Sequence, residues 1–497
     1  MQVSARIGRG LVVVAGALLL LWPAILNGDP LFYPDSISYL GDGRPLARML
    51  FLHWPKGYVA MRSEFYSLGI FFFHWNVTAW PIVVLQALLT AFVLWLVVRS
   101  FGARSLHARN SGAGSSDVRG VAAQFLILTA LVSLTTSLAW YVCFVMPDIL
   151  GPVAYLAVYL LVFARETLSA RERWAVAAIA AWGMAAHSTH LMLAAGLCVL
   201  LALLLALRWP PLRRGPRQSW IAGVGARGRG LASIAAIVLV VAGAQMALHS
   251  YLYGKASLFG NRMPYTMARF IADGPGRWYL QAHCGELHWA ICDRVGDLPD
   301  NDDDFLWTDG GVWQGASPAK QEQMLHEEWP LVLATLRAYP GAQLRVSLDN
   351  FGTELTEFGM WDFTPNPWMA SEMDKVLPGT LPRYLQTRQA QSRLPTEFFT
   401  LVQEGVVSVS ALAIAVFVSM LWRWRRWRIL GLIAVVVPVV IANAFLTAVL
   451  SEVDSRYQCR VVWLIPLAAG LIVLDLLNRR ANSVLPDVPT AGVHTPS

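Results

Sequence analysis

The stretch Trp422–Val449, WRWRRWRILGLIAVVVPVVIANAFLTAV, decides the fold class of this chain. Its first seven residues include four arginines, and the twenty-one residues that follow, 429–449, contain no charged side chain. A helix of about 20 apolar residues is long enough to cross the hydrocarbon core of a bilayer. The stretch therefore predicts a transmembrane helix that begins beside a cluster of cations.

The composition of the whole chain indicates the same class. Of 497 residues, 56% are hydrophobic and 14% are charged, and the mean hydropathy is +0.48. Soluble domains usually carry about 25% charged residues. Apolar runs recur at 10–26, 79–98, 121–140, 148–164, 174–187, 190–207, 230–249, 401–421, 429–449 and 461–477. The sequence thus predicts an all-α polytopic membrane protein with about ten transmembrane helices.

Cations are concentrated in the loops that follow every second predicted span. Besides the cluster at 422–428, these loops contain Arg99, Arg104, Arg109, Arg119, Arg165, Arg171, Arg173, Arg208, Arg213, Arg214, Arg217, Arg479 and Arg480. Short loops rich in Lys and Arg stay in the cytoplasm. This rule predicts that both termini are cytoplasmic, and it favours a bacterial inner membrane. A nucleic-acid partner is not expected, because the cations lie at helix ends and not on one face of a folded domain.

The predicted spans divide the chain into four regions. Residues 1–249 hold spans one to seven with a first outer loop at 27–78, residues 250–400 form an outer, periplasmic domain, residues 401–478 hold spans eight to ten, and residues 479–497 form a cytoplasmic tail that is expected to be disordered. The outer domain is expected to be small, mixed and mostly helical. Helices are predicted after Ser317 and after Pro340, and mainly turns and loops between 256 and 316.

The cysteines of the outer domain are a candidate disulfide pair. Cys284 and Cys292 lie eight residues apart in a compartment that permits disulfides if it is a periplasm. Cys459 is a third cysteine on the same predicted side, so the pairing stays open.

Ionisable residues gather in the short outer loops. Asp35 lies in FYPDSISYL (32–40), flanked by Tyr33 and Tyr39; the others are Asp148, His187, His190, Arg456 and Tyr457. Each has a structural alternative. The two aspartates can cap helices, the histidines can be polar interface residues, and the Arg–Tyr pair can anchor a helix at the lipid headgroups. Their concentration on one side of the membrane is the main functional signal.

In order and side, these motifs resemble those of the type C glycosyltransferases, polytopic enzymes that use polyprenyl-phosphate-linked sugars. The similarity is to the branch of the protein O-mannosyltransferases and the lipid A aminoarabinose transferases. It rests on Tyr33-Pro34-Asp35-Ser36, on Arg62-Ser63-Glu64-Phe65-Tyr66, on Asp148, and on Arg456-Tyr457 before a last helix that contains Pro466. It covers most of residues 1–210 and 400–477. The chain departs from the family pattern in having one acid in the first motif and Glu64 where the second has proline.

The resemblance implies transfer of a sugar from a polyprenyl-phosphate donor to a lipid, glycan or protein acceptor at the outer face. Asp35 is then expected to be the general base, and Asp148 to orient the acceptor or Asp35. The residues expected to bind the donor phosphate are Arg456, Tyr457, Lys56 and Arg62. Tyr33, Tyr39, His187 and His190 are expected to contact substrate. No cofactor is expected; some members of the class use a divalent metal, but the single acid favours metal-independent chemistry.

Three other functions stay open at this point. A transporter of lipid-linked saccharides would usually have its site near the midplane between internal repeats. An O-antigen-type polymerase or ligase would use paired arginines in a large outer loop, for which Arg262, Arg269 and Arg277 are candidates. A non-catalytic assembly protein would act through the 250–400 domain, with Asp35 serving only as a helix cap.

Overall fold

The computed structural model describes residues 2–52, 57–102, 114–207, 209, 220–260 and 262–484. Within these ranges the chain is helical, and extended backbone pairs only in one parallel bridge between Leu31 and Phe144. The helices of the first half are α1 (Gln2–Leu18), α2 (Trp22–Asn27), α3 (Pro34–Phe51), α4 (Glu64–His74), α5 (Trp80–Gly102), α6 (Gly114–Thr135), α7 (Leu138–Val142), η2 (Pro147–Ile149), α8 (Leu150–Phe163), η3 (Arg165–Thr167), α9 (Ala170–Ala185), α10 (Ser188–Ala206) and α12 (Trp220–Tyr253).

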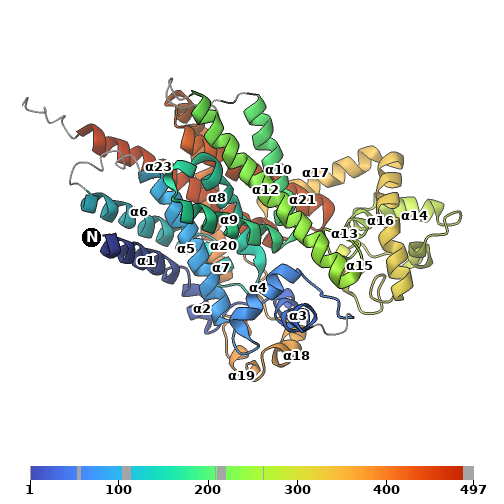
Figure 1. Cartoon of the computed structure of the whole chain (residues 1–497). Helices are drawn as coiled ribbons and strands as arrows, with labels where there is room; N and C mark the ends of the chain where they lie inside the picture. The colour runs from blue at the N-terminus through green and yellow to red at the C-terminus, as the bar shows by residue number, and fades with distance from the viewer. Residues whose placement is uncertain are drawn as a thin grey trace, which may run out of the picture.

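The second half continues with shorter helices and ends in three long ones (Figure 1). These are α13 (Tyr265–Ala272), α14 (Pro275–His283), η5 (Ala290–Asp297), α15 (Asp302–Trp307), α16 (Pro318–Ala338), α17 (Pro340–Thr356), α18 (Pro367–Val376), α19 (Leu381–Tyr384), α20 (Thr396–Arg423), α21 (Trp427–Leu450), α22 (Ser455–Val462) and α23 (Leu464–Val484). Helix α23 ends at Val484 and so takes in the first residues of the predicted tail at 479–497. The remainder of the tail lies outside the described residues.

Six helical stretches among the described residues are long and apolar enough to cross a membrane. They are Trp80–Gly102, Ser188–Ala206, Arg227–Tyr253, Thr396–Arg423, Trp427–Leu450 and Ser455–Asn478. Shorter apolar helices occur at Gly8–Leu18, Arg119–Thr135 and Pro147–Phe163. The protein is therefore an all-helical integral membrane protein.

The predicted span at 10–26 is interrupted. Helix α1 ends at Leu18, and the chain resumes as α2 at Trp22, with Pro23 in the first turn. Proline has no N–H to donate to the preceding turn and its ring clashes with the carbonyl there, so α1 cannot continue through it. The span predicted at 121–140 likewise divides into α6 and α7.

The two ends of the bundle differ in chemistry. Asp148 lies just before α8 and Arg165 just after it. At the Arg165 end, Arg99 pairs with Glu172 at 2.6 Å and Arg428 with Glu166 at 2.8 Å. These pairs join loops that the sequence predicts to be cytoplasmic; Arg104, Arg109, Arg208, Arg213, Arg214 and Arg217 lie outside the described residues. The opposite end, where Asp148 lies, is called the site end below.

The region 27–78 was expected to be a loop, but two of its segments are helical. Pro34 occupies the first turn of α3, and the backbone N–H of Tyr33 donates to Ser36 Oγ at 2.9 Å in a capping box. Asp35 therefore lies in the first turn of a helix and not in a loop. Helix α3 packs on α4 and on α18, and these helices lie together at the bottom of Figure 1.

The chain between α12 and α20 has more helix than its sequence indicated. Helices α13, α14, η5 and α15 occupy most of 265–307, where turns and loops were expected. Their apolar sides meet α16 in a small core that includes Met267, Ile271, Leu280, Phe305 and Leu331. Each helix has nine residues or fewer, which is too short for a sustained periodic pattern to reveal it.

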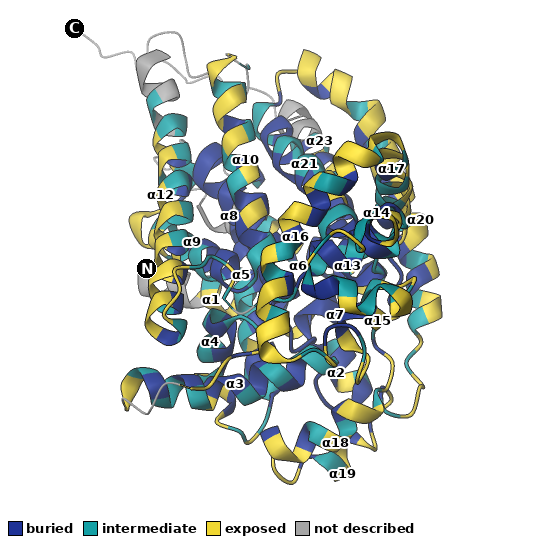
Figure 2. Cartoon of the chain, turned by 90° about the vertical axis from the view of Figure 1, so that its right-hand side faces the viewer, coloured by how far each residue is buried: buried dark blue, intermediate teal, exposed yellow. Residues whose placement is uncertain are grey.

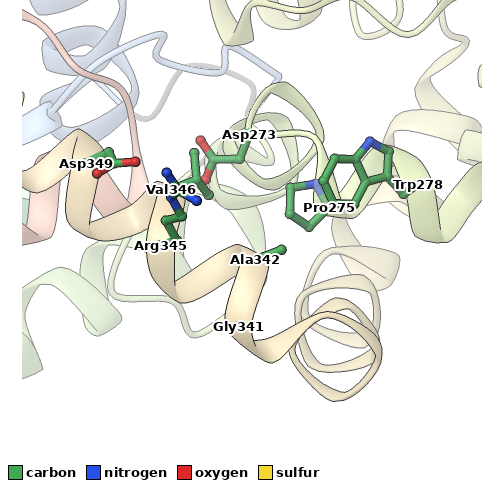
Figure 3. Close-up of a pocket in the computed structure, with 8 residues that line it drawn as sticks. All are labelled: Asp273, Pro275, Trp278, Gly341, Ala342, Arg345, Val346 and Asp349. Carbon is green, nitrogen blue, oxygen red and sulfur yellow. The ribbon is translucent and has the colours of Figure 1, made fainter.

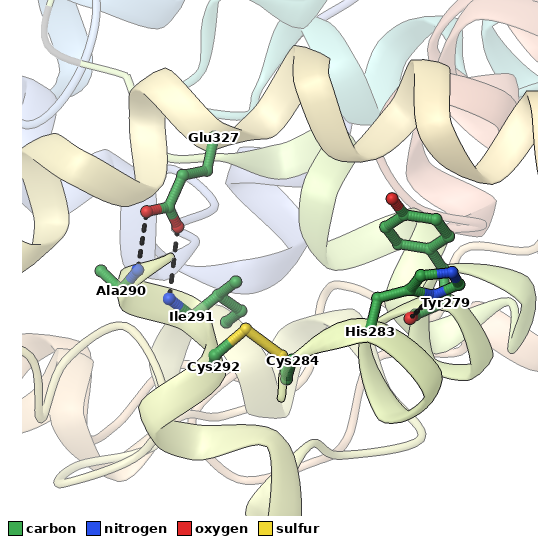
Figure 4. The surroundings of a disulfide bond; sticks show 7 residues. All are labelled: Tyr279, His283, Cys284, Ala290, Ile291, Cys292 and Glu327. Carbon is green, nitrogen blue, oxygen red and sulfur yellow. Dashed lines mark hydrogen bonds between the residues drawn. A yellow bond between two sulfur atoms is a disulfide. The ribbon is translucent and has the colours of Figure 1, made fainter. Parts of the chain in front are cut away.

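A disulfide joins Cys284 to Cys292 beside this small core (Figure 4). Next to it, the carboxylate of Glu327 on α16 accepts hydrogen bonds from the backbone N–H groups of Ala290 and Ile291, at 2.6 and 3.2 Å. The disulfide and the carboxylate thus hold the start of η5 between α14 and α16.

Candidate functional site

Asp35 is the centre of a cluster of partly buried charges at the site end. Its carboxylate forms an ion pair with Arg62, and its Oδ2 lies 3.9 Å from Nη1 of Arg456. Asp35, Arg62 and Arg456 are far apart in sequence, so the fold itself brings them together. The guanidinium of Arg62 is also covered from the 254–395 segment, by Tyr265 Oη at 3.4 Å and by the ring of Trp307 at 5.0 Å.

Arg456 is held by aromatic rings and by loosely placed carboxylates. Its guanidinium lies over the ring of Tyr33 at 4.3 Å and over that of Tyr457 at 4.9 Å. Its Nε is 3.6 Å from Asp454 Oδ2, beyond a good hydrogen bond, and finds no hydrogen-bond partner among the described residues. The side chain is thus fixed in position while part of its donor capacity stays unused.

Asp148 forms a second, more deeply buried pair. Its Oδ1 accepts from Nη1 of Arg460 at 3.2 Å, and Nη2 of Arg460 donates to Asn443 Oδ1 at 3.1 Å. The side chain of Asp148 is 4% exposed, against 18% for Asp35. Arg460 was not singled out from the sequence. Arg460 follows Arg456 by four residues, which places both arginines on one face of α22. This spacing is the feature of the sequence that could have identified Arg460 as a site residue.

A second polar network fixes the backbone that carries Arg62. Asp42 on α3 accepts from the backbone N–H groups of Met61 and Arg62, at 3.1 and 3.2 Å, and from the hydroxyl of Tyr58. Burial raises the pKa of Asp42 to about 6. The network explains how a segment outside any helix holds Arg62 against Asp35.

Glu64 starts α4 on the other side of Arg62. Its carboxylate accepts from the hydroxyl of Tyr253 at 2.7 Å and lies 3.2 Å from Nε2 of His249. Both partners are on α12, so the acid at this position, where the family motif has proline, ties α4 to a candidate span.

Several further carboxylates surround Arg456, among them Asp362 and Glu354, which the sequence did not single out. Asp454 caps α22, and its own backbone N–H donates to Glu354 Oε2 of α17 at 2.9 Å. Asp362 lies beside Asp454. Burial raises the pKa of Asp362 to about 7, and the Asp454 carboxylate contributes to the rise; burial also raises the pKa of Glu354 to about 8. Protons are therefore available near neutral pH next to the arginines.

The segment 357–366 brings Asp362 to this place. Phe363 packs against Trp140, Tyr141 and Phe144 in the bundle core. The backbone N–H of Met360 donates to Thr400 Oγ1 at 3.0 Å. The packing of Phe363 thus fixes Asp362 close to Asp148 and Arg456.

The histidines lie at the start of α10. His187 caps the helix, its Nδ1 accepting from the backbone N–H of Thr189 at 3.3 Å, and its ring is 5.2 Å from that of His190. Burial lowers the pKa of His187, and His190, Arg460, Arg456 and Arg62 lower it further. His190 is buried against α8, where Gly151 leaves room for its ring.

The remaining predicted site residues are placed differently. Tyr39 is buried against Tyr66, with ring centroids 4.9 Å apart, and it lies within electrostatic range of Asp35 and Arg62. The hydroxyl of Tyr457 donates to Glu452 at 2.7 Å while its ring supports Arg456. Lys56 lies outside the described residues. No group of three or more His, Cys, Asp or Glu among the described residues is arranged to hold a metal ion.

Comparisons with protein-family models, with curated proteins and with solved structures found no match to this chain.

Proposed function

We propose that the protein is a membrane glycosyltransferase that moves a sugar from a polyprenyl-phosphate donor to a hydroxyl of a lipid, glycan or protein acceptor. The observation that carries the proposal is the placement of Asp35 between Arg62 and Arg456 at the site end. It puts a carboxylate base beside cations suited to a phosphate leaving group.

Each step of the transfer has a residue of the right type. Asp35 removes the proton of the acceptor hydroxyl as the oxygen attacks the anomeric carbon. The bond from that carbon to the phosphate oxygen breaks, and its electron pair leaves with the phosphate. Arg456 receives the phosphate through its guanidinium, because this planar group matches phosphate oxygens, and its Nε has no hydrogen-bond partner among the described residues. Tyr33 keeps that guanidinium in position.

Asp148 has a positioning role in this scheme. It is more buried than Asp35 and is bound to Arg460, so it is less able to reach an acceptor. Its pair with Arg460 fixes the face of α22 that carries Arg456.

The polymerase or ligase alternative is less well supported. Arg262 pairs with the buried Glu328, Arg269 with Asp273 at 2.7 Å, and Arg277 with Asp300. All three arginines of the outer segment are thus engaged by carboxylates within the segment. A transporter site near the midplane is likewise not favoured, since these charges lie at the site end of the helices.

The test uses purified protein in phospholipid nanodiscs with a mixed pool of labelled polyprenyl-phosphate sugars. Wild type is expected to release the label from one donor, and Asp35→Asn to leave every donor intact. Asp309→Asn changes an exposed carboxylate of the outer segment and serves as the matched control, which should behave like wild type. Thermal unfolding establishes that each variant is folded.

Two results would overturn parts of the proposal. Equal donor consumption by wild type and Asp35→Asn removes Asp35 as the base. If folded wild type consumes no donor while the lipids remain extractable, transferase activity on these donors is excluded, and transport or assembly assays follow.

A further inference from the structure

The exposed face of α16 changes character along its length. Near its start the exposed side chains are Glu322, Gln323 and His326. Toward its end they are Trp329 at 51%, Leu333 at 49% and Leu336 at 41% exposed. The three apolar residues follow the spacing i, i+4 and i+7, which places them on one side of the helix. In Figure 2, α16 faces the viewer with this exposed side.

Helix α17 continues the apolar surface after the sharp turn at Tyr339. Leu344 and Leu348 are 61% and 54% exposed. These two leucines and Phe351 follow the spacing i, i+4 and i+7, which places them on one side of the helix. The residues at 342, 345, 346 and 349, on another side of α17, border a pocket of about 530 Å³ with Asp273 and Trp278 (Figure 3). Helix α17 therefore has exposed leucines on one side and, on another, a pocket whose charged lining residues are Asp273, Arg345 and Asp349.

The exposed leucines of α17 lie next to an exposed apolar part of the helical bundle. Phe351, one turn beyond Leu348, contacts Phe445 of α21 with ring centroids 6.0 Å apart. Phe445 and Ile441 are 47% and 45% exposed on a candidate span. An outward-facing Phe and Ile on a spanning helix face acyl chains. The apolar surface of α16 and α17 is thus continuous with a surface that lipid covers.

We propose that the end of α16 and the start of α17, residues 329–348, lie in the bilayer interface at the site end, with Trp329, Leu333, Leu344 and Leu348 buried among the acyl chains. Amphipathic helices with Trp and Leu on one side and charges on another bind membranes in this way. Arg337 and Arg345 are exposed beside this surface and suit phosphate headgroups.

This contact bears on the site, although the proposal does not depend on the proposed function. Helix α17 carries Glu354, which holds the backbone of Asp454 two residues before Arg456. Anchoring of α17 in lipid therefore steadies the helix that supports Arg456.

Single cysteines carrying a fluorophore test the proposal in nanodiscs of phosphatidylcholine and phosphatidylglycerol. The positions are Leu333→Cys, Leu344→Cys and Leu348→Cys, with Gln323→Cys on the exposed face of α16 as the matched control. Cys198 is replaced by serine, and protein without an introduced cysteine measures labelling of the buried Cys143 and Cys459. Phospholipids brominated on the acyl chains should remove most emission at the three leucine positions and little at 323, and aqueous iodide should do the reverse.

A second measurement needs no variant. A phospholipid with a photoreactive diazirine in its acyl chain is activated in nanodiscs that hold wild-type protein, and the labelled peptides are identified by mass spectrometry. Peptides from 329–348 should carry lipid, and those from 317–326 should not. Iodide quenching at all four labelled positions with no lipid adduct on 329–348 overturns the proposal. So does protection from both quenchers that disappears on dilution, which would assign the surface to a second copy of the chain.

Discussion

At the scale of single residues, Arg456 is held more by ring contacts than by charge. It lies over Tyr33 and Tyr457, and its nearest carboxylate distances are 3.6 and 3.9 Å. A lysine keeps the charge but loses the planar fork and the ring stacking. We expect Arg456→Lys to lower kcat/KM for the donor by about ten- to a hundredfold, equivalent to about 1.5–3 kcal/mol for lost hydrogen bonds to a charged group.

The measurement is initial-rate kinetics over a range of donor concentrations, with Arg423→Lys as control. Arg423 is an exposed arginine at the opposite end of the bundle, so its replacement should leave kcat/KM unchanged. An unaltered kcat/KM in Arg456→Lys would show that a single positive charge is enough for donor binding and that the planar guanidinium of Arg456 has no special role.

Asp362 makes stability depend on pH in a definite direction. Burial raises its pKa from 3.8 to about 7, so the folded protein keeps a proton that the unfolded chain releases between about pH 4 and 7. The stabilisation is fully present below that window and is lost as pH rises through it. We expect Asp362→Asn, which mimics the protonated acid, to lose less stability than wild type between about pH 4 and 7.

Thermal unfolding in detergent at several pH values measures this effect. Glu354, with a pKa near 8, titrates over part of the same range, so Glu354→Gln alone and the double variant separate the two contributions. An unfolding temperature that falls as steeply in Asp362→Asn as in wild type would contradict the assignment.

The residues that the sequence could and could not reveal differ in a physical way. Asp35, Asp148, Arg62 and Arg456 lie in predicted outer loops or at predicted span edges, close to apolar runs against which charges are conspicuous, and the structure groups all four. Asp362 gave no such signal. It lies in a polar segment, and only the packing of Phe363 into the bundle brings it to Arg456. Such long-range packing leaves no periodic trace in a sequence.

At the scale of elements, α8 and α9 pack closely at a glycine. A Cβ on Gly183 would lie 2.6 Å from the carbonyl oxygen of Leu150 and 3.0 Å from Cβ of Ala154. The backbones of α8 and α9 cannot move aside as a flexible side chain can. We therefore expect Gly183→Ala to destabilise the protein by about 1–3 kcal/mol. The same glycine's carbonyl lies 3.0 Å from His190 Nδ1, so its displacement moves that histidine too.

Gly196 provides the control for this substitution. It lies within α10, and a Cβ there meets nothing within 4 Å. Replacing it by alanine removes the conformational cost of a helical glycine, and we expect Gly196→Ala to be neutral or stabilising by about 0.5–1 kcal/mol. Thermal unfolding of both variants in the same detergent measures the two changes in stability. Equal changes would show that close packing at Gly183 is not the cause of its destabilisation.

Helix boundaries at this scale followed local chemistry that hydropathy does not measure. The long apolar spans α5, α10, α20 and α21 lie where their runs predicted. Pro23 divided a run that hydropathy joins, and the capping box at Tyr33 and Ser36 made a helix of a stretch that reads as a loop. Caps and prolines set these boundaries through one or two residues, which a window of about 20 residues averages away.

At the scale of the whole molecule, the orientation in the membrane decides whether the proposed donor can reach the site. The site end carries Asp35 and Arg456, and the other end carries the arginine-rich loops around Arg99 and Arg428. Since such loops stay cytoplasmic, we expect the site end to face outward. Two exposed positions can report this orientation when each is replaced by cysteine. Glu322 lies on the site side, in the 254–395 segment, and Arg423 lies at the other end.

Each cysteine is introduced singly into the Cys198→Ser protein, which is produced in cells that are then converted to spheroplasts. A membrane-impermeant maleimide should label the cysteine of Glu322→Cys without permeabilisation. It should label the cysteine of Arg423→Cys only after permeabilisation, because the intact membrane separates the reagent from a thiol on the cytoplasmic side. The reverse pattern would place Asp35 and its arginines in the cytoplasm. A lipid-phosphate sugar presented at the outer face would then never meet Arg456, and the reaction proposed above would be impossible whatever the residues at the site.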